Sequence, residues 1–323
     1  MVMLPKVTIL VPSYNHSLYI ADAIKSVWDQ SYPDLQLIVV DDGSSDQSYE
    51  IICKLAAISP IEMLVVRQAN QGICPTLNHA LSLATGEVIG ILASDDLMMP
   101  NRLLQEAVIF SKNSELKVLY SNGCFQYEGK SYGDVHKVIK TFLKRGIDFT
   151  LKKLLKNAPG FYIQAMLIKK DFLLFVGAFD EETGSDDWSL HIRIFRALNK
   201  STNYIYFENN AFMYRLHDLQ NHRNRNFLSP MKRRVVRKYF SLEGRAHYIC
   251  NEYLRSALFN LLKGDFTRAR RCLKKVYSIG SVNGVPWKCI AGQSIKVPPF
   301  LVRNILNKFT KLLLSIKKNT NKL

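Results

Sequence analysis

VTILVPSYN (Val7–Asn15) and LQLIVVDDGSSD (Leu35–Asp46) are two apolar runs that each end in a cluster of polar residues. The helix-like stretch Leu18–Trp28 lies between them, so the order strand, helix, strand predicts a βαβ unit with parallel strands. A third run of this kind, ILASDD, ends at Asp96. Because ligands of open α/β sheets bind at the carboxyl ends of the strands, three polar strand ends on one edge predict a site for a nucleotide and a metal ion.

Strand and helix patterns alternate through the first third of the chain. We expect strands at Val7–Val11, Leu35–Val40, Glu62–Val66, Val88–Leu92 and Val118–Ser121, with helices at Leu18–Trp28, Gln47–Ala57, Pro75–Leu83 and Pro100–Phe110. This alternation predicts an α/β fold with a mostly parallel central sheet and helices on both faces. The polar, glycine-punctuated segment Gly123–Gly146 is expected to form loops and at most a hairpin.

The charge of the chain is divided very unevenly. Residues 1–227 hold 23 Lys and Arg against 24 Asp and Glu, a net charge of −1. Residues 228–323 hold 21 against 3, a net charge of +18. We therefore predict a neutral domain at residues 1–227 and a basic helical extension at residues 228–323, and a segment this basic favours an anionic partner.

The basic extension leaves three interpretations open. Its last segment, Phe300–Lys318, has apolar residues at helical spacing opposite lysines, which is typical of helices that lie on anionic membrane surfaces. The extension can also be a helical cap on the domain with a solvated basic face. Nucleic acid is not expected as a partner, because the chain contains no RNA- or DNA-binding motif.

The cysteines and the apolar runs indicate the compartment. The six cysteines are scattered without a Cys-x-x-Cys pair, so reduced thiols are favoured over disulfides, a metal site or a redox motif. No run approaches the roughly 18 apolar residues that a membrane span needs, and the first residues lead directly into a strand. We expect no signal peptide and a cytoplasmic protein that is peripheral at the inner face of the cell membrane.

The acidic residues at the strand ends each have two possible roles. Asp95 and Asp96 can hold a divalent cation through hard oxygen ligands, or they can cap the next helix. Asp42 can hydrogen-bond a base or a ribose, or it can belong to a turn rich in Gly and Ser. Tyr14, at the end of the first strand, can stack on a base or be a half-buried structural tyrosine.

A second acidic pair precedes Trp188 in SDDWSLHIRIF, where apolar residues at helical spacing predict a helix over Asp186–Leu198. Asp187, held at the N-terminus of that helix and facing the sheet edge, can serve as a general base or simply cap the helix. His217, in YRLHD, is a candidate ligand, although a lone histidine is more often structural.

The order of these motifs resembles the family 2 glycosyltransferases of the GT-A fold. The resemblance covers about Val7–His217 and depends on the stretches VTILVPSYN, SVWDQSYPDLQLIVVDDGSSD, QANQG, ATGEVIGILASDDLMMP, GAFDE, SDDWSLHIR and YRLH. It implies a Rossmann-like domain that binds a nucleotide-diphosphate sugar together with Mg²⁺ or Mn²⁺.

The resemblance also implies a role for each matching residue. Asp187 matches the catalytic base, and Asp96 and His217 match ligands of the metal. Asp42 matches the residue that hydrogen-bonds the base of the donor, and Asp95 the one that contacts its ribose. Three further donor-binding positions close the first strand, where the tyrosine packs on the base: Pro12, Tyr14 and Asn15.

The implied function is an inverting glycosyltransferase. Asp187 would deprotonate an acceptor hydroxyl, which displaces the nucleoside diphosphate from the sugar in one step. The acceptor is expected to be a glycan or a lipid-linked molecule of polysaccharide biosynthesis, and the basic extension to contact an anionic membrane surface. The alternatives are a sugar nucleotidyltransferase, whose glycine-rich, arginine-containing loop is missing from PSYNHS, and a non-catalytic protein that binds nucleotide sugars or nucleic acid.

Overall fold

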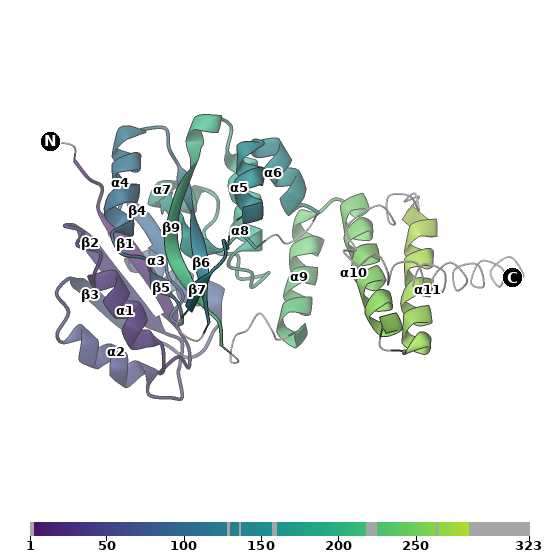
Figure 1. The fold of residues 1–323 in the computed structure, drawn as a ribbon, viewed down its shortest axis with the longest axis horizontal. Coiled ribbons are helices and arrows are strands. Elements are labelled where there is room, and N and C mark those ends of the chain that lie inside the picture. Colours follow the sequence, from purple (N-terminus) through teal and green to yellow (C-terminus); the bar gives the residue numbers. More distant parts are fainter. Residues whose placement is uncertain are drawn as a thin grey trace, which may run out of the picture. The chain divides into compact units, whose positions relative to one another are not determined.

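The computed structural model describes residues 3–127, 130–135, 137–156, 160–217, 225–262 and 264–283. The chain divides into two compact units, Met1–Lys238 and Tyr239–Leu323. The first unit is a sheet surrounded by helices (Figure 1). This unit ends at Lys238, eleven residues after the boundary between a neutral and a basic part that the charge distribution predicts at residue 227. The division into domains at residues 1–227 and 228–323 stays a prediction.

The sheet of the first unit has the strand order β3-β2-β1-β4-β8-β6-β9-β5, with β7 paired to β6. Strands β1, β2, β3 and β4 pair with one another in parallel. Strand β8 is antiparallel to both β4 and β6, and β5 is antiparallel to β9. The expected α/β architecture is confirmed. The strands are β1 (Val7–Ser13), β2 (Leu35–Asp41), β3 (Glu62–Arg67), β4 (Val88–Ile91), β5 (Leu97–Met98), β6 (Val118–Tyr127), β7 (Lys130–Tyr132), β8 (Met166–Lys169) and β9 (Tyr204–Arg215).

Helices cover both faces of the sheet. On one face, buried residues of α1, α2 and α4 join alternate residues of β1 (Val7, Ile9 and Val11) in one apolar core. On the other face, α3 packs against β1 and β2. The helices of this unit are α1 (Ile20–Trp28), α2 (Ser48–Ala56), α3 (Ile73–Leu83), α4 (Arg102–Lys112), α5 (Lys137–Lys144), α6 (Ile147–Leu154), α7 (Lys170–Phe175), α8 (Trp188–Ala197) and α9 (Arg225–Tyr239), with 3₁₀ turns η1 (Ile163–Ala165) and η2 (Ser201–Asn203).

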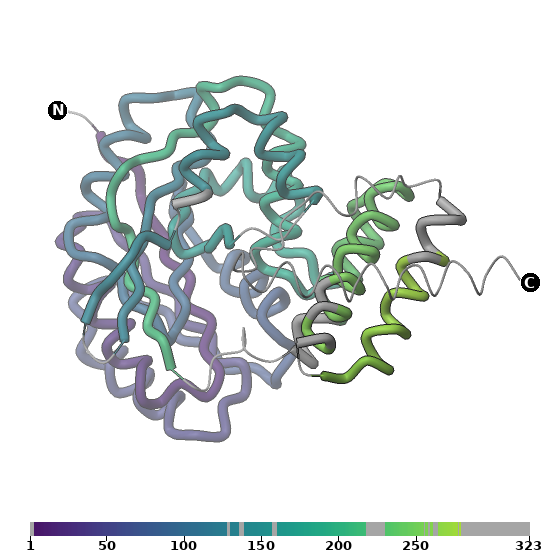
Figure 2. The backbone as a smooth tube through the Cα atoms, turned by 45° about the vertical axis from the view of Figure 1, so that its right-hand side comes forward, coloured from purple at the N-terminus to yellow at the C-terminus, as the bar shows by residue number. Residues whose placement is uncertain are grey.

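Of the loops and hairpin expected over Gly123–Gly146, the hairpin is present between β6 and β7, whereas the expectation of loops is wrong where α5 forms. Strand β6 continues through Gly123 to Tyr127 and runs beside β9 (Figure 2), and α5 follows the β6–β7 hairpin. A Cβ atom at Gly123 would lie 2.4 Å from the ring of Phe212. The glycine therefore admits an aromatic ring of the neighbouring strand and does not break the strand.

The second unit contains the paired helices α10 (Leu242–Leu262) and α11 (Phe266–Asn283), which share a small core around Cys250 and Leu273. The chain leaves helical conformation between α9 and α10, so the start of the basic extension is not one continuous helix. The amphipathic segment Phe300–Lys318 lies outside the described residues.

Within the part of the chain that the structure describes, no helix is both long enough and apolar enough to cross a membrane.

Candidate functional site

The carboxyl ends of β1 and β2 lie side by side at one edge of the sheet, because the two strands are parallel and in register over their whole length. Just past β1, Asn15 turns the chain with a positive φ of 55°. Its side-chain oxygen accepts a hydrogen bond from the backbone N–H of Ser45, 2.8 Å away, which ties the two strand ends together. Tyr14 is 46% exposed and available to a ligand, whereas Pro12 is buried within β1.

Asp42 follows β2 and organises the loop that leads into α3. Its carboxylate is buried and accepts three hydrogen bonds of 2.9 Å, from the Gln68 side chain and from the backbone N–H groups of Gln71 and Gly72. A carboxylate that holds several backbone N–H groups makes a loop rigid. The structure therefore gives Asp42 a loop-shaping role, and its contact with a base stays a prediction.

Asp96, in the turn after β4, is almost completely buried. One carboxylate oxygen accepts a hydrogen bond from the backbone N–H of Arg215 at 3.0 Å, and the other accepts one from the Gln164 side chain at 2.9 Å. Burial, followed by the charge of Asp95, raises the pKa of Asp96 well above its usual range. Both oxygens of the expected metal ligand thus have protein donors.

Asp95 is the more accessible carboxylate of the pair, with 16% of its side chain exposed. Its Oδ2 lies 3.1 Å from Nε2 of His217 and 3.9 Å from Nε2 of His16. Burial opposes ionisation of Asp95, but the His217 hydrogen bond and the charges of both imidazoles outweigh it, so the pKa lies below its usual range. A carboxylate flanked by two imidazoles is a suitable place for a cation or a diphosphate.

Arg215, the last residue of β9, holds this turn in place. Its guanidinium donates hydrogen bonds to the carbonyls of Asp95 at 2.6 Å and Tyr19 at 3.0 Å, and to the Asp22 carboxylate at 3.1 Å. The ring of Tyr19 in turn stacks on His217 with a centroid distance of 4.4 Å. The start of α1, the turn after β4 and the end of β9 therefore form one connected structure.

Asp187 occupies the N-cap position of α8. Its Oδ1 accepts hydrogen bonds from the backbone N–H of Trp188 and from the Ser185 hydroxyl, the latter at 3.2 Å. The indole of Trp188 is buried and donates to the carbonyl of Leu154 at 2.8 Å, which anchors the start of the helix. The helix expected from SDDWSLHIRIF is thus present, and a capping geometry is compatible with either role of the carboxylate.

The two adjacent carboxyl groups at this helix start are reluctant to ionise. Burial, followed by the charge of Asp187, raises the pKa of Asp186 to about 7. Burial also raises the pKa of Asp187, against the hydrogen bonds that it accepts. A raised pKa makes a carboxylate a stronger base near neutral pH.

Two tyrosines place the acidic groups in one neighbourhood. The rings of Tyr162 and Tyr214 lie 5.2 Å apart. Burial raises the pKa of Tyr162, and the charges of Asp187 and Asp96 raise it further. Burial also raises the pKa of Tyr214, with contributions from Asp96, Asp95 and Asp187. Since the interaction between two charges weakens with distance, the turn after β4 and the start of α8 both lie near these two tyrosines.

Several residues of this neighbourhood were not expected from the sequence. His16 directly follows the first strand motif and Arg215 stands within YRLH, so both could have been found by extending those motifs. Tyr214 is the first residue of YRLH and could have been found with it, whereas Gln164 and Tyr162 carry no sequence signal, because the packing of η1 against β9 brings them to the site. Among the residues that the structure describes, no group of three or more His, Cys, Asp or Glu side chains is arranged to hold a metal ion.

Comparison with known proteins identifies the family. The profile of glycosyl transferase family 2 matches residues 8–175. The chain belongs to this family. The enzyme class expected from the motifs, a glycosyltransferase, is therefore confirmed.

Relatives and solved structures agree with this assignment. An uncharacterized glycosyltransferase of Nostoc sp. is 33% identical over 115 residues, which are 36% of this chain and 36% of that protein, so the match spans about a third of its length. The fold resembles S. aureus TarS 1–349 in complex with UDP-GlcNAc (TM-score 0.56, 16% identity, 85% and 92% of the two chains). It also resembles the mannosyltransferase PcManGT from Pyrobaculum calidifontis with GDP-Man and Mn²⁺ (TM-score 0.55, 18% identity, 97% and 81%). The GT-A fold of the family 2 domain is confirmed.

Proposed function

We propose that this family 2 member is an inverting, metal-dependent glycosyltransferase that uses a nucleotide-diphosphate sugar. The observation that carries the proposal is the shared neighbourhood of Asp187 with Asp95 and Asp96 around Tyr162 and Tyr214. A base on one side of a cleft and a diphosphate-binding turn on the other is the arrangement that an in-line displacement requires.

The donor nucleotide would bind along the ends of β1 and β2. Exposed Tyr14 would pack on the base. Asp42 would present the loop at Gln71 and Gly72, whose backbone N–H groups it holds. Asn15 would support this surface through its bond to Ser45. The neighbours TarS and PcManGT bind UDP-GlcNAc and GDP-Man, respectively, which supports a nucleotide-sugar donor without choosing the base.

The residues at the turn after β4 fit a divalent cation in their donor chemistry. Asp95 and His217 would supply ligand atoms from the pair that they form, and Asp96 the second carboxylate of the turn. The Mn²⁺ in the complex of PcManGT supports this assignment. When bound, the cation would neutralise charge that develops on the leaving diphosphate.

Asp187 would act as the general base. Ser185 and the Trp188 N–H fix one carboxylate oxygen, which leaves the other to accept the proton of an acceptor hydroxyl. That hydroxyl oxygen forms a bond to the anomeric carbon as the bond to the diphosphate breaks on the opposite face. One displacement inverts the anomeric configuration and needs no covalent enzyme intermediate.

The acceptor would be a glycan or a lipid-linked molecule at the inner face of the cell membrane. This part of the proposal is supported by α11, where five exposed basic residues lie opposite the buried Ala269, Leu273 and Val276. Each basic residue near an anionic leaflet contributes about 1 kcal/mol to binding. The five residues are Arg268, Arg270, Arg271, Lys274 and Lys275.

A thermal-shift screen of UDP- and GDP-sugars, with and without Mn²⁺, tests the donor proposal. We expect one donor class to raise the melting temperature only when the metal is present, because a ligand that binds the folded state stabilises it. The same donor should then be hydrolysed slowly by the full chain. Metal-independent stabilisation or the absence of hydrolysis for every donor would reject the proposal.

Sedimentation with vesicles tests the membrane proposal. The full chain should bind vesicles containing phosphatidylserine and not those of phosphatidylcholine alone. Changing the α11 residues Arg268, Arg271 and Lys275 to Gln should weaken that binding. Equal binding to both kinds of vesicle, or no effect of the triple variant, would remove α11 from the membrane contact.

A further inference from the structure

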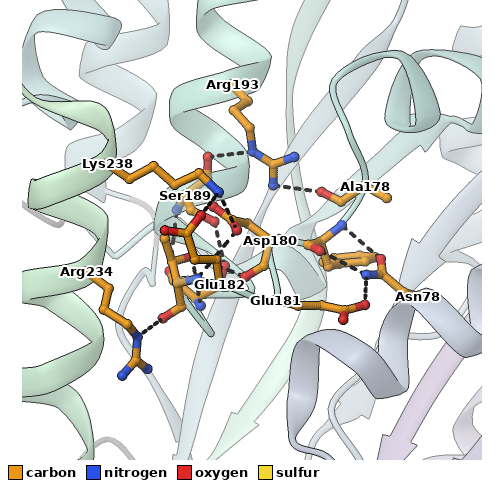
Figure 3. Close-up of polar contacts among 12 residues, drawn as sticks. Asn78, Ala178, Asp180, Glu181, Glu182, Ser189, Arg193, Arg234 and Lys238 are labelled. Atoms are coloured by element: carbon orange, nitrogen blue, oxygen red, sulfur yellow. Dashed lines mark hydrogen bonds and ion pairs between the residues drawn. The ribbon is translucent and has the colours of Figure 1, made fainter.

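The segment Gly177–Asp187, which we name the base loop, carries Asp187 at its end and is held from three sides (Figure 3). It has little regular structure: Asp180 and Ser185 form an isolated antiparallel bridge. Gly177 and Gly184 have φ values of +83° and +65°, a conformation that other residues rarely adopt. A segment of this kind needs external contacts to keep one conformation.

Two of the three sides are formed by α3 and α8. From α3, the Asn78 amide donates to the carbonyl of Phe179 at 2.9 Å and accepts from its N–H at 3.0 Å. From α8, the guanidinium of Arg193 donates to the carbonyls of Val176 and Ala178, both at 2.7 Å. These contacts fix the first residues of the loop, and Asn78 also donates to the carboxylate of Glu181 at 2.6 Å.

The third side is α9, which contacts the acidic middle of the loop. Nζ of Lys238 lies 2.9 Å from Oδ1 of Asp180 and 2.7 Å from Oε2 of Glu182. Arg234, one helical turn earlier, donates from Nε to the carbonyl of Thr183 at 3.0 Å. In Figure 3 both side chains reach from α9 towards the loop.

Short contacts connect this anchored middle to the base. The N–H of Gly184 donates to the carbonyl of Asp180 at 3.0 Å. Asp180 is bridged to Ser185, and the Ser185 hydroxyl donates to Asp187. Asp180, Thr183 and Ser185 are all buried, so a displacement at the Lys238 contact has little room to be absorbed before it reaches the carboxylate.

We infer that Lys238 and Arg234 of α9 are positioning residues that hold the base loop in the conformation that presents Asp187 to the acceptor. This inference depends on the proposed role of Asp187 as the base. It assigns a part in the reaction to a helix that lies beyond residues 8–175, the range that the family profile matches. The charge of Lys232, also on α9, acts on Asp187 in addition and lowers its pKa.

Lys238 pairs with two carboxylates of the base loop that differ in their exposure to water. Asp180 is 8% exposed, and an ion pair with a buried carboxylate is less screened by water than a surface pair. Glu182 is exposed, so its contact with the same ammonium group contributes little to stability and mainly orients the lysine side chain. The lysine therefore ties one buried and one exposed acidic group of the loop to α9.

The test uses the full chain with Lys238→Ala, Lys238→Arg and Glu182→Gln, and with Lys6→Ala as matched control. Lys6 also faces two carboxylates, Glu62 at 2.8 Å and Asp34 at 4.0 Å, but at the opposite edge of the sheet. Two readouts are compared: amide hydrogen exchange of residues 178–187, and kcat and KM for hydrolysis of UDP-GlcNAc or GDP-mannose with Mn²⁺.

We expect faster exchange in residues 178–187 of Lys238→Ala and a kcat that falls roughly 10- to 100-fold, since small misplacements of a reacting group have effects of this size. The KM for the donor should stay within about twofold, because the donor site proposed at the ends of β1 and β2 does not include the loop middle. Lys238→Arg should restore most of kcat, Glu182→Gln should have a smaller effect than Lys238→Ala, and Lys6→Ala should change neither readout.

The two readouts separate this inference from the proposed function. If the wild-type chain hydrolyses a donor and Lys238→Ala keeps its kcat, the inference is wrong and the transferase proposal stands. If the wild-type chain hydrolyses no donor, the transferase proposal fails and hydrogen exchange alone decides: unchanged exchange in Lys238→Ala would overturn the anchoring by α9 as well.

Discussion

Two pairs of adjacent aspartates lie near Tyr162 and Tyr214, and the protein surrounds them differently. The pair Asp95–Asp96 lies among cationic or potentially cationic groups, namely the imidazoles of His16 and His217 and the guanidinium of Arg215. The pair Asp186–Asp187 is stabilised mainly by neutral donors, a serine hydroxyl and a backbone N–H. The same dipeptide thus occurs in two electrostatic environments.

The difference in environment appears in the pKa values. Neighbouring imidazoles hold the pKa of Asp95 below its usual range, in spite of burial, so this carboxylate stays charged and is suited to a cation. Burial raises the pKa of Asp96, so within the first pair this charged character belongs to Asp95. Burial raises the pKa values of both Asp186 and Asp187, so this pair is suited to accept a proton. Sequence patterns show where carboxylates are, whereas their surroundings decide which chemistry each can perform.

The largest effect should come from removing the base. Asp187→Asn keeps an oxygen that can accept from Trp188 N–H and Ser185, so the fold and donor binding should persist. Transfer should fall by roughly 10²- to 10⁴-fold, the usual contribution of a general base. The measurement is kcat together with donor affinity from calorimetry. If donor affinity falls as much as kcat, Asp187 belongs to the donor side, and the division between the two pairs breaks down.

A smaller effect, on metal-dependent donor binding, should distinguish Asp95 from Asp96 in the first pair. Asp95→Asn should weaken Mn²⁺-dependent donor binding by roughly 10- to 100-fold, the range found when groups around a metal are changed. Asp96→Asn should have less effect, because both oxygens of Asp96 accept hydrogen bonds from the protein and an amide can keep the bond from Arg215. Donor titrations at several Mn²⁺ concentrations measure this. The reverse order would favour Asp96 as the principal ligand, as the family motif implies.

The sequence predicts those parts of the fold that depend on residues close together in the chain, and it misses those that depend on residues far apart. The strands β1 and β2 and the start of α8 follow from local patterns of apolar, polar and acidic residues, and all three are present. The strand through Gly123 was missed because its glycine accommodates the ring of Phe212, which lies far along the chain.

The site shows the same limit. The ends of β1, β2 and β4 predict that Asn15, Asp42 and Asp96 gather at one edge, since parallel strands bring their carboxyl ends together. The two oxygens of Asp96 accept hydrogen bonds from Gln164 and Arg215, which lie 68 and 119 residues further along the chain. No local pattern specifies such contacts, and they decide which carboxylate is accessible.

The smallest effect should be a pH dependence of the folding stability that arises from Asp186 of the second pair. Folded Asp186 keeps its proton up to a pH of about 7, whereas in the unfolded chain an aspartate releases it near pH 4. Between these values the folded state binds more protons than the unfolded state, so this group's contribution to stability is present below about pH 4 and is lost as pH rises towards 7.

Asp186→Asn lacks this contribution, because an amide does not titrate. The melting temperature of the variant relative to wild type should therefore rise between about pH 5 and pH 8, by a few degrees at most for a domain of this size. Asp95→Asn is the control and should show no change with pH in this window, because the contribution of a carboxyl with a lowered folded pKa is already complete above about pH 4. A difference between Asp186→Asn and wild type that does not vary with pH would mean that Asp186 is ionised throughout. The two aspartate pairs would then have the same electrostatic character, and the raised basicity proposed for Asp187 would lose its support.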